Sequence, residues 1–140
     1  MAPPRGIVPI TPDGNCFFRA VSVVVTGSQE FHLRLRDLLV EFMSRSSTVA
    51  GYLRHQEVEK SSHLKNMQRP GVWATDAELF AAALFLETDI FTFVDGWRRF
   101  SCQGTQRAPV KYPAVYLINK MNHYEVVKSV LSSKGPMPHS

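Results

Sequence analysis

Cysteine is scarce in this 140-residue chain, which holds only Cys16 and Cys102, and no Cys-x-x-Cys or His-x-x-x-His spacing occurs. Small secreted domains usually carry more cysteines, so two free thiols in a reducing compartment are expected rather than a disulfide framework. Because paired ligand spacings are missing, we predict no metal site, and no other cofactor is expected. The apolar runs "VSVVV" and "LFAAALFL" are far shorter than the roughly 20 residues of a membrane span, so no membrane partner is predicted.

Long basic runs are also missing, although the formal net charge is +4. No ribonucleoprotein motif and no basic run of about five to eight residues occurs, which favours a solvated basic surface over a nucleic-acid partner. The basic residues are scattered, as in Arg34 and Arg36, Lys60 and Lys65, and Arg98 and Arg99. The N-terminal "MAPPRGIVPI" lacks a charged segment followed by a long apolar stretch, so we expect no signal peptide and a cytoplasmic protein, with the nucleus as an alternative.

Helical spacing marks the first part of the chain. Apolar and small residues after Cys16 recur at helical spacing until Gly27, which predicts a helix stabilised by burial rather than by the propensity of its valines. Ser28 is placed to cap a second, amphipathic helix. The apolar stripe expected on that helix consists of Phe31, Leu35, Leu38, Leu39, Phe42 and Met43.

The middle of the chain, residues 45–70, is polar and serine-rich and ends at a Pro-Gly breaker. Weaker helical patches cover residues 49–53 and 58–67. Thr75 and Glu78 then have the spacing of a capping box, and the helix that they open is apolar nearly all round. Such a helix is expected to be buried against a sheet.

Strand signals gather in the second half. "DIFTFV" and "WRRFSC" flank an Asp95-Gly96 hairpin turn, and "AVYLI" and "HYEVVKSV" flank a turn at residues 119–122. Helices followed by a mostly antiparallel sheet describe an α+β domain. We predict one domain over residues 1–130 and a disordered tail over residues 131–140.

The stretch "PDGNC", residues 12–16, places a cysteine directly after four turn-forming residues and at a helix start. Unpaired N–H groups and the helix dipole favour a thiolate there, so the pKa of Cys16 is expected to be lowered, as a nucleophile requires. The same turn can direct backbone amides at one point and form an oxyanion hole. A buried, inert thiol is the alternative for Cys16 from this stretch alone, and Cys102 is interpreted as structural.

A nucleophilic thiol needs a base, and His123 is the best placed of five histidines. It enters a late strand in which positions 123 and 125 face the same side, so Glu125 can bind one ring nitrogen and orient the other. An ordinary surface carboxylate is the alternative for Glu125. The other histidines, His32, His55, His63 and His139, are interpreted as solvent-facing or hydrogen-bonded.

Together, "PDGNCFFRA" and "YLINKMNHYEVV" resemble the ovarian tumour (OTU) family of cysteine proteases, which are mostly deubiquitinases. In that family a D-G-N-C segment carries the nucleophile, and a histidine followed by an aromatic and a polar residue carries the base. "FHLRLRDLLVEFM" and "WATDAELFAAALFLETDIFTF" resemble further helices and a strand of the family, in family order over about residues 7–128. The resemblance implies a papain-like cysteine protease (OTU) fold, with helices packed around a small, mostly antiparallel sheet.

The resemblance also implies a role for each matching residue. The implied catalytic residues are Cys16 as nucleophile, His123 as general base and Glu125 as third member, while Asp13 with the turn Gly14 and Asn15 shapes the oxyanion loop. Glu125 departs from the family, which usually has Asp or Asn at its place. Because Glu is one methylene longer, Asp13 and Asn122 stay open as alternatives for orienting the imidazole.

The implied reaction is hydrolysis of isopeptide bonds at the C-terminal glycine of ubiquitin or a ubiquitin-like modifier, through a thioester. The implied partner is ubiquitin or a polyubiquitin chain, bound by a monomeric enzyme. A tail that ends in two glycines needs a narrow channel, and Trp73, Trp97 and Tyr124 are candidates to line it, with ordinary packing as the alternative. The carboxylates considered for the basic tail of ubiquitin are Glu57, Glu59, Asp76 and Glu78.

Two other functions stay open. A catalytically inactive OTU-like module that binds ubiquitin is compatible with the unusual Glu125, although Cys16 and His123 are both intact. A basic nucleic-acid-binding domain rests on net charge alone.

Overall fold

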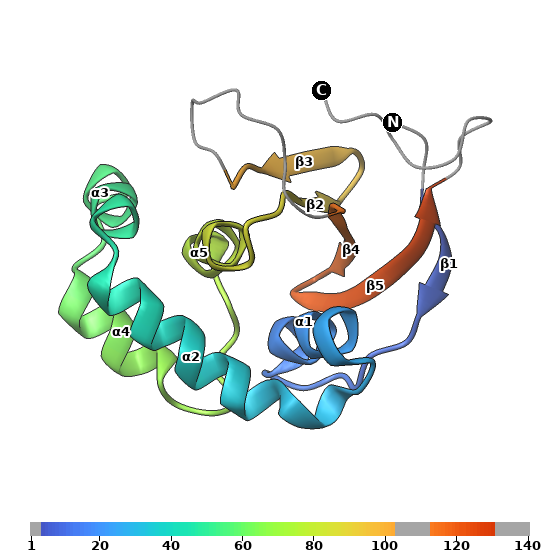
Figure 1. The fold of residues 1–140 in the computed structure, drawn as a ribbon, viewed down its shortest axis with the longest axis horizontal. Coiled ribbons are helices and arrows are strands. Elements are labelled where there is room, and N and C mark those ends of the chain that lie inside the picture. The colour runs from blue at the N-terminus through green and yellow to red at the C-terminus, as the bar shows by residue number, and fades with distance from the viewer. Residues whose placement is uncertain (1–3, 103–112, 131–140) are drawn as a thin grey trace.

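A single sheet forms one side of the molecule in the computed structural model, which describes residues 4–102 and 113–130 (Figure 1). Within these residues the sheet contains β1 (Pro4–Val8), β2 (Ile90–Phe93), β3 (Trp97–Phe100), β4 (Val115–Lys120) and β5 (His123–Val130), in the order β1-β5-β4-β2-β3. Neighbouring strands run antiparallel except β2 and β4, which are parallel. The α+β class and the mostly antiparallel sheet are therefore confirmed.

The edge strand β1 was not expected from the sequence. It pairs with β5, where Ile7 lies opposite Val127 and Val8 opposite Val126. Proline and glycine both disfavour an interior strand, so Pro4 and Gly6 hide this strand from a reading of the sequence. In the structure Gly6 has a positive φ of 67°. At the edge of a sheet, only one side of a strand needs ladder hydrogen bonds, so proline is tolerated there.

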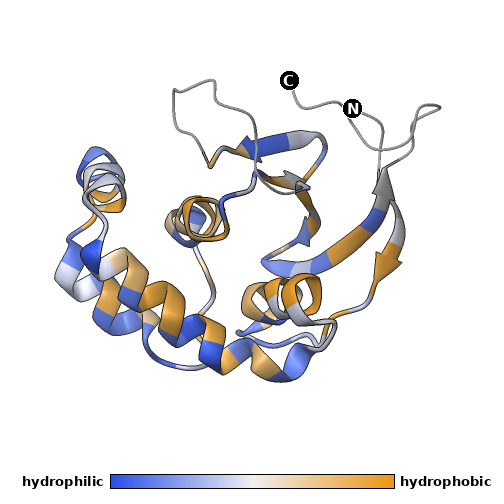
Figure 2. Cartoon of the chain, viewed as in Figure 1, coloured by the Kyte–Doolittle hydropathy of each residue, from blue (hydrophilic) through white to orange (hydrophobic). Residues whose placement is uncertain are grey.

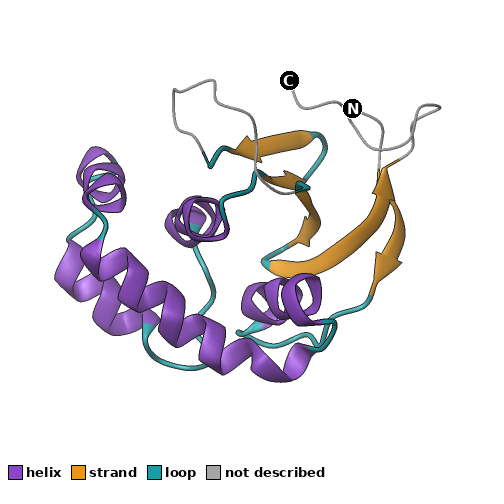
Figure 3. Ribbon diagram, viewed as in Figure 1, coloured by secondary structure: helices purple, strands orange, loops and turns teal. Residues whose placement is uncertain are grey.

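The helices lie in two layers on one side of the sheet (Figure 3). They are α1 (Cys16–Thr26), α2 (His32–Arg45), α3 (Ser47–His55), α4 (Lys60–Met67) and α5 (Asp76–Leu86). Helix α1 packs against β5, and α5 packs against β2 and β3, while α2 contacts both α1 and α5 from the outside. In Figure 2, α1 and α5 are strongly apolar, whereas the outer α3 and α4 carry more polar residues.

Several local predictions are confirmed. Helix α1 begins at Cys16 and ends before Gly27, whose left-handed φ of 86° suits glycine. The capping box formed by Thr75 and Glu78 opens α5. The weak patches in the serine-rich segment belong to α3 and α4. Ser28 caps a 3₁₀ turn at Gln29–Phe31 instead of the α-helix, which begins at His32.

The buried stripe of α2 differs from the prediction. It is centred on Arg36, Leu39, Val40 and Met43, whereas Phe31 is 47% exposed. The buried face includes Arg36 because backbone carbonyl oxygens accept hydrogen bonds from its guanidinium and a phenyl ring packs against it. The assignment of Arg36 to a solvated basic surface is therefore wrong.

The described ranges 4–102 and 113–130 contain no helix that is long and apolar enough to cross a membrane. The expected tail, residues 131–140, lies outside the described residues, and so does His139.

Candidate active site

The Cys16 thiol lies between two backbone groups of the β4–β5 hairpin. Cys16 is the first residue of α1 and only 2% exposed. Its Sγ donates a hydrogen bond to the carbonyl oxygen of Asn122 at 3.1 Å and accepts one from the backbone N–H of Tyr124 at 3.4 Å. These two groups flank His123 in the sequence, so the fold brings the cysteine and the histidine predicted as nucleophile and base to one place.

A tight turn makes this approach possible. Met121 and Asn122 both have positive φ, 52° and 70°, which is the backbone of a type I′ hairpin turn. The Asn122 N–H donates to Oδ1 of Asn119 at 2.9 Å, which holds the turn from the last part of β4. The register pairs Lys120 with His123, so the turn comprises just two residues. The carbonyl of Asn122 is thereby fixed against α1.

The imidazole of His123 has two different environments. Nε2 lies 3.4 Å from Oε2 of Glu125, as the strand spacing predicted. Nδ1 is buried and has no hydrogen-bond partner within the described part of the chain. The Cys16 thiol therefore directs its proton at the Asn122 carbonyl and not at the ring. One ring nitrogen is held by a carboxylate and the other is unoccupied, which is the state that a general base needs.

The expected low pKa of the Cys16 thiol is wrong for this structure. Burial raises its pKa above the ordinary value of 9.0, because the thiolate would lose its hydration. Hydrogen bonds from the N–H groups of Tyr124 and Phe17 lower the pKa, and the negative charge of Asp13 raises it further. Desolvation therefore outweighs the favourable helix start.

Asp13 is occupied within its own loop. Its carboxylate forms an ion pair with Arg19 at 2.8 Å and accepts a hydrogen bond from the backbone N–H of Asn15 at 3.0 Å. The Arg19 hydrogen bonds hold the pKa of Asp13 below its usual value. Among the described residues, no hydrogen bond joins Asp13 to His123, so the structure favours Glu125 over Asp13 as the neighbour of the imidazole.

The predicted oxyanion loop is tightly bonded. The Cys16 N–H donates to the Asp13 carbonyl oxygen at 3.1 Å, while the Asn15 N–H is taken by the Asp13 carboxylate. Gly14 packs against Gly71 so closely that a Cβ on Gly14 would lie 1.7 Å from the Gly71 carbonyl oxygen. A glycine at position 14 is therefore a steric requirement.

A cleft of about 200 Å³ opens beside these groups. It is lined by residues 12–14, the turn residues 121–122, His123 and Trp73. Trp73, one of the three aromatic candidates for a substrate channel, is 53% exposed at this cleft.

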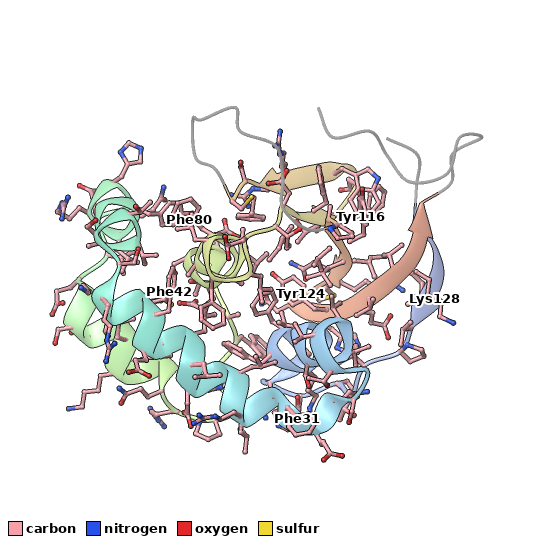
Figure 4. The ribbon with its side chains drawn as sticks, in the orientation of Figure 1. Phe31, Phe42, Phe80, Tyr116, Tyr124 and Lys128 are labelled. Atoms are coloured by element: carbon pink, nitrogen blue, oxygen red, sulfur yellow. The ribbon has the colours of Figure 1, made fainter. Side chains whose placement is uncertain are left out.

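The other two channel candidates take the packing alternative, which corrects the prediction. Tyr124 points from β5 into the interior (Figure 4), where its ring packs edge-on against Phe17 at 5.4 Å. Trp97 lies on β3, at the opposite edge of the sheet from β1, and packs against Phe93 and Tyr116. The Tyr124 ring therefore packs in the core and the Trp97 ring on the sheet, and neither lines the cleft.

Of the carboxylates considered for the ubiquitin tail, Glu78 is excluded. It is fully buried, caps Thr75 and lies 2.6 Å from Nε2 of His63. Asp76 is paired with Arg98 at 2.7 Å. Glu57 and Glu59 are exposed, and Glu59 caps α4. His63 is thus hydrogen-bonded, as expected from the sequence.

The architecture is that of a papain-like cysteine protease: an α+β domain in which the thiol at a helix start is hydrogen-bonded to the backbone on both sides of a histidine that begins a strand. The sequence model of the "OTU-like cysteine protease" family matches residues 11–132. The chain belongs to this family.

Several known proteins are similar to the chain. An Arabidopsis thaliana protein, "OVARIAN TUMOR DOMAIN-containing deubiquitinating enzyme 7", is 31% identical over 84 residues, which is 60% of this chain and 22% of the relative. The "Structure of OTUD1 OTU domain" has a TM-score of 0.67 at 25% identity, covering 86% of this chain and 83% of the other. An OTU deubiquitinase from Wolbachia pipientis wMel, bound to ubiquitin, has a TM-score of 0.61 at 17% identity, covers 93% and 97%, and shares the fold. The chain spans about a fifth or less of the curated relatives it matches.

Proposed function

We propose that this chain is a deubiquitinase that hydrolyses isopeptide bonds at the C-terminal glycine of ubiquitin or a ubiquitin-like modifier. The proposal rests on one observation: beside an open cleft, the Cys16 thiol is hydrogen-bonded to the backbone of the residues on either side of His123. Support also comes from a similar Arabidopsis protein named as a deubiquitinating enzyme and from OTU structures bound to ubiquitin.

The first chemical step forms a bond between Sγ of Cys16 and the carbonyl carbon of the terminal glycine. His123 takes the thiol proton on Nδ1, and the carbonyl oxygen receives the displaced electron pair. When that pair returns, the bond to the lysine nitrogen breaks and His123 gives its proton to the leaving amine. A thioester remains on Cys16. Water attacks it with His123 again as base, which releases ubiquitin with a free carboxylate and restores the thiol.

The neighbouring residues have supporting roles in this proposal. Glu125 fixes the imidazole and stabilises its protonated form from the Nε2 side. Gly14, Asn15 and Asp13 form the loop before Cys16 that is proposed to stabilise the developing oxyanion, and the Asn15 and Cys16 amides must leave their bonds to Asp13 to donate to it. All of these residues come from one chain, so a monomer is the proposed active form. Its proposed partner is ubiquitin or a polyubiquitin chain, without a nucleic acid, a membrane or a cofactor.

The test is a ubiquitin probe with an electrophile at its C-terminus. We expect it to label the wild-type chain at Cys16, and to label Cys102→Ala equally well but Cys16→Ala not at all. Peptide mass spectrometry assigns the modified thiol. Labelling at Cys102, or none at either cysteine, overturns the proposal.

A second function is favoured by two features of the Cys16 thiol. The pKa of Cys16 is raised and its proton is directed at Asn122, which also suits an inactive module that only binds ubiquitin. A panel of diubiquitins of different linkage separates the two functions. Cleavage that disappears with Cys16→Ala supports the enzyme, whereas binding without cleavage by the wild type supports the module.

A further inference from the structure

Arg36 is a buried cation held entirely by neutral groups. It lies on α2 and is 1% exposed, which is rare for arginine. Its Nη1 donates to the carbonyl oxygen of Met67 at 3.0 Å, and its guanidinium carbon lies 4.2 Å from the ring centre of Phe18. Of the carboxylates in the described ranges, none is within ion-pair distance of the guanidinium. A buried charge without a counter-ion is costly, so its retention needs a reason.

The reason lies at the other end of the guanidinium. Nη2 donates to Oδ1 of Asn15 at 2.9 Å, to the Val72 carbonyl at 2.9 Å and to the Gly14 carbonyl at 3.3 Å. Two of these acceptors belong to the loop directly before Cys16, and the third belongs to the segment that leads to Trp73. Arg36 therefore connects two of the segments that line the cleft, the loop at Gly14 and the segment that leads to Trp73.

Asn15 completes this connection. It stands at the N-cap position of α1, yet its side chain makes no capping bond. Instead, its Oδ1 accepts from Arg36 and also from the backbone N–H of Gly71 at 2.7 Å. The same two segments touch where Gly14 leaves no room for a Cβ against Gly71. Arg36, Asn15 and Gly71 thus hold the loop from two directions, and we name these three residues the loop clamp.

We propose that Arg36 is a positioning residue for the hydrolysis: through Asn15 and Gly14 it holds the loop directly before Cys16, whose amides are the proposed oxyanion donors. This inference rests on the proposed function. Arg36 does not touch the cleft, so it acts on the reacting atoms through the loop alone. Loosening the loop misplaces donors that matter in the transition state and leaves the binding of ubiquitin over the wider surface intact. The effect is therefore expected in kcat and not in KM.

Arg36→Lys tests the forked geometry, because lysine keeps the positive charge but has a single ammonium group in place of the two donor nitrogens of the guanidinium fork. We expect kcat for ubiquitin cleavage to fall about tenfold to a hundredfold, with KM changed by less than about threefold. Arg34→Lys, at an exposed position on the same helix, is the matched control and is expected to keep wild-type kcat. Assays are run well below the Tm of each variant. A wild-type kcat for Arg36→Lys, or a loss in KM alone, overturns the proposal.

Asn15→Ala provides a second route if Arg36→Lys does not fold. It removes the shared acceptor while leaving the guanidinium in place, and we expect a loss of kcat of the same order. If both residues act through one clamp, Arg36→Lys/Asn15→Ala loses no more than the larger single loss. Multiplied losses in the double variant contradict a common clamp.

Two readouts keep this inference separable from the proposed function. Alkylation of Cys16 by iodoacetamide needs no oxyanion donors, so its rate in Arg36→Lys should stay within about threefold of wild type, with Cys102 in the same digest as internal standard. Hydrogen exchange at the Gly71 amide needs no ubiquitin, and we expect it to speed up at least about tenfold in Arg36→Lys and Asn15→Ala. Wild type that fails to cleave ubiquitin defeats the proposed function. Unchanged Gly71 exchange defeats the clamp.

Discussion

The Sγ of Cys16 lies 3.1 Å from the carbonyl oxygen of Asn122 and directs its proton there. The chain thus positions its thiol by backbone groups on both sides of His123, while Nδ1 of the imidazole stays unoccupied. Attack on a carbonyl carbon requires that the thiol proton leave the Asn122 carbonyl and pass to Nδ1 of His123. The substrate-free site is therefore assembled but protonated.

The first prediction concerns the reactivity of this thiol. Because burial raises the pKa of Cys16 above 9.0, its alkylation by iodoacetamide in the folded protein should rise with pH through and beyond that value. Near neutral pH, the folded chain should react more slowly at Cys16 than the urea-unfolded chain does. Rates are followed by peptide mass spectrometry. An inflection below neutral pH would show that a thiolate–imidazolium pair already exists without substrate.

The second prediction compares the two acidic residues of the site. Glu125→Gln weakens the contact that orients His123 and removes the charge that favours its protonated form, so kcat should fall about tenfold or more. Asp13→Asn keeps a hydrogen-bond acceptor for Asn15 and should cost kcat less than Glu125→Gln does. The measurement is kcat for cleavage of a ubiquitin isopeptide substrate by the two variants, compared at equal folded fraction. An equal or reversed order would assign the orienting role to Asp13.

Local signals in the sequence predicted much of this fold and site. The Gly27 stop, the Thr75–Glu78 capping box and the pairing of His123 with Glu125 all depend on residues a few positions apart. Short-range sterics and hydrogen bonds decide such features, so one sequence suffices to find them. The D-G-N-C segment and the histidine segment indicated the family, and the family resemblance predicted that the distant Cys16 and His123 share one site.

Features that depend on residues distant in the sequence were not predicted. Arg36 stands in an i, i+3, i+4, i+7 stripe with Leu39, Val40 and Met43, but only the carbonyls of other segments make its burial acceptable. The pKa of Cys16 likewise depends on how completely the β4–β5 hairpin covers the sulfur. The edge strand β1 exists because β5 offers it a partner.

The third prediction uses two glycines with opposite expected effects. Gly14→Ala would bring a Cβ to 1.7 Å from the Gly71 carbonyl, so the loop must move or the protein destabilises by about 1–3 kcal/mol or more. Gly51→Ala lies within α3, where the nearest atom is a flexible Arg54 nitrogen at 3.7 Å, and should stabilise by about 0.5–1 kcal/mol. Urea unfolding of both variants measures the changes. A neutral Gly14→Ala contradicts the close packing of the loop on Gly71.

The last prediction follows from the contact between His63 and the buried Glu78. The hydrogen bond to Glu78 raises the pKa of His63 above 6.5, and burial opposes it only in part. A histidine whose folded pKa is raised contributes stability that is fully present below 6.5 and is lost as pH rises through the folded value. The free energy of unfolding should therefore fall across that window, relative to His63→Gln, which lacks the titration. Urea midpoints at about pH 6 and about pH 9 give the difference between the two proteins. A wild-type curve parallel to that of His63→Gln would mean that the pair gains nothing from the proton on His63.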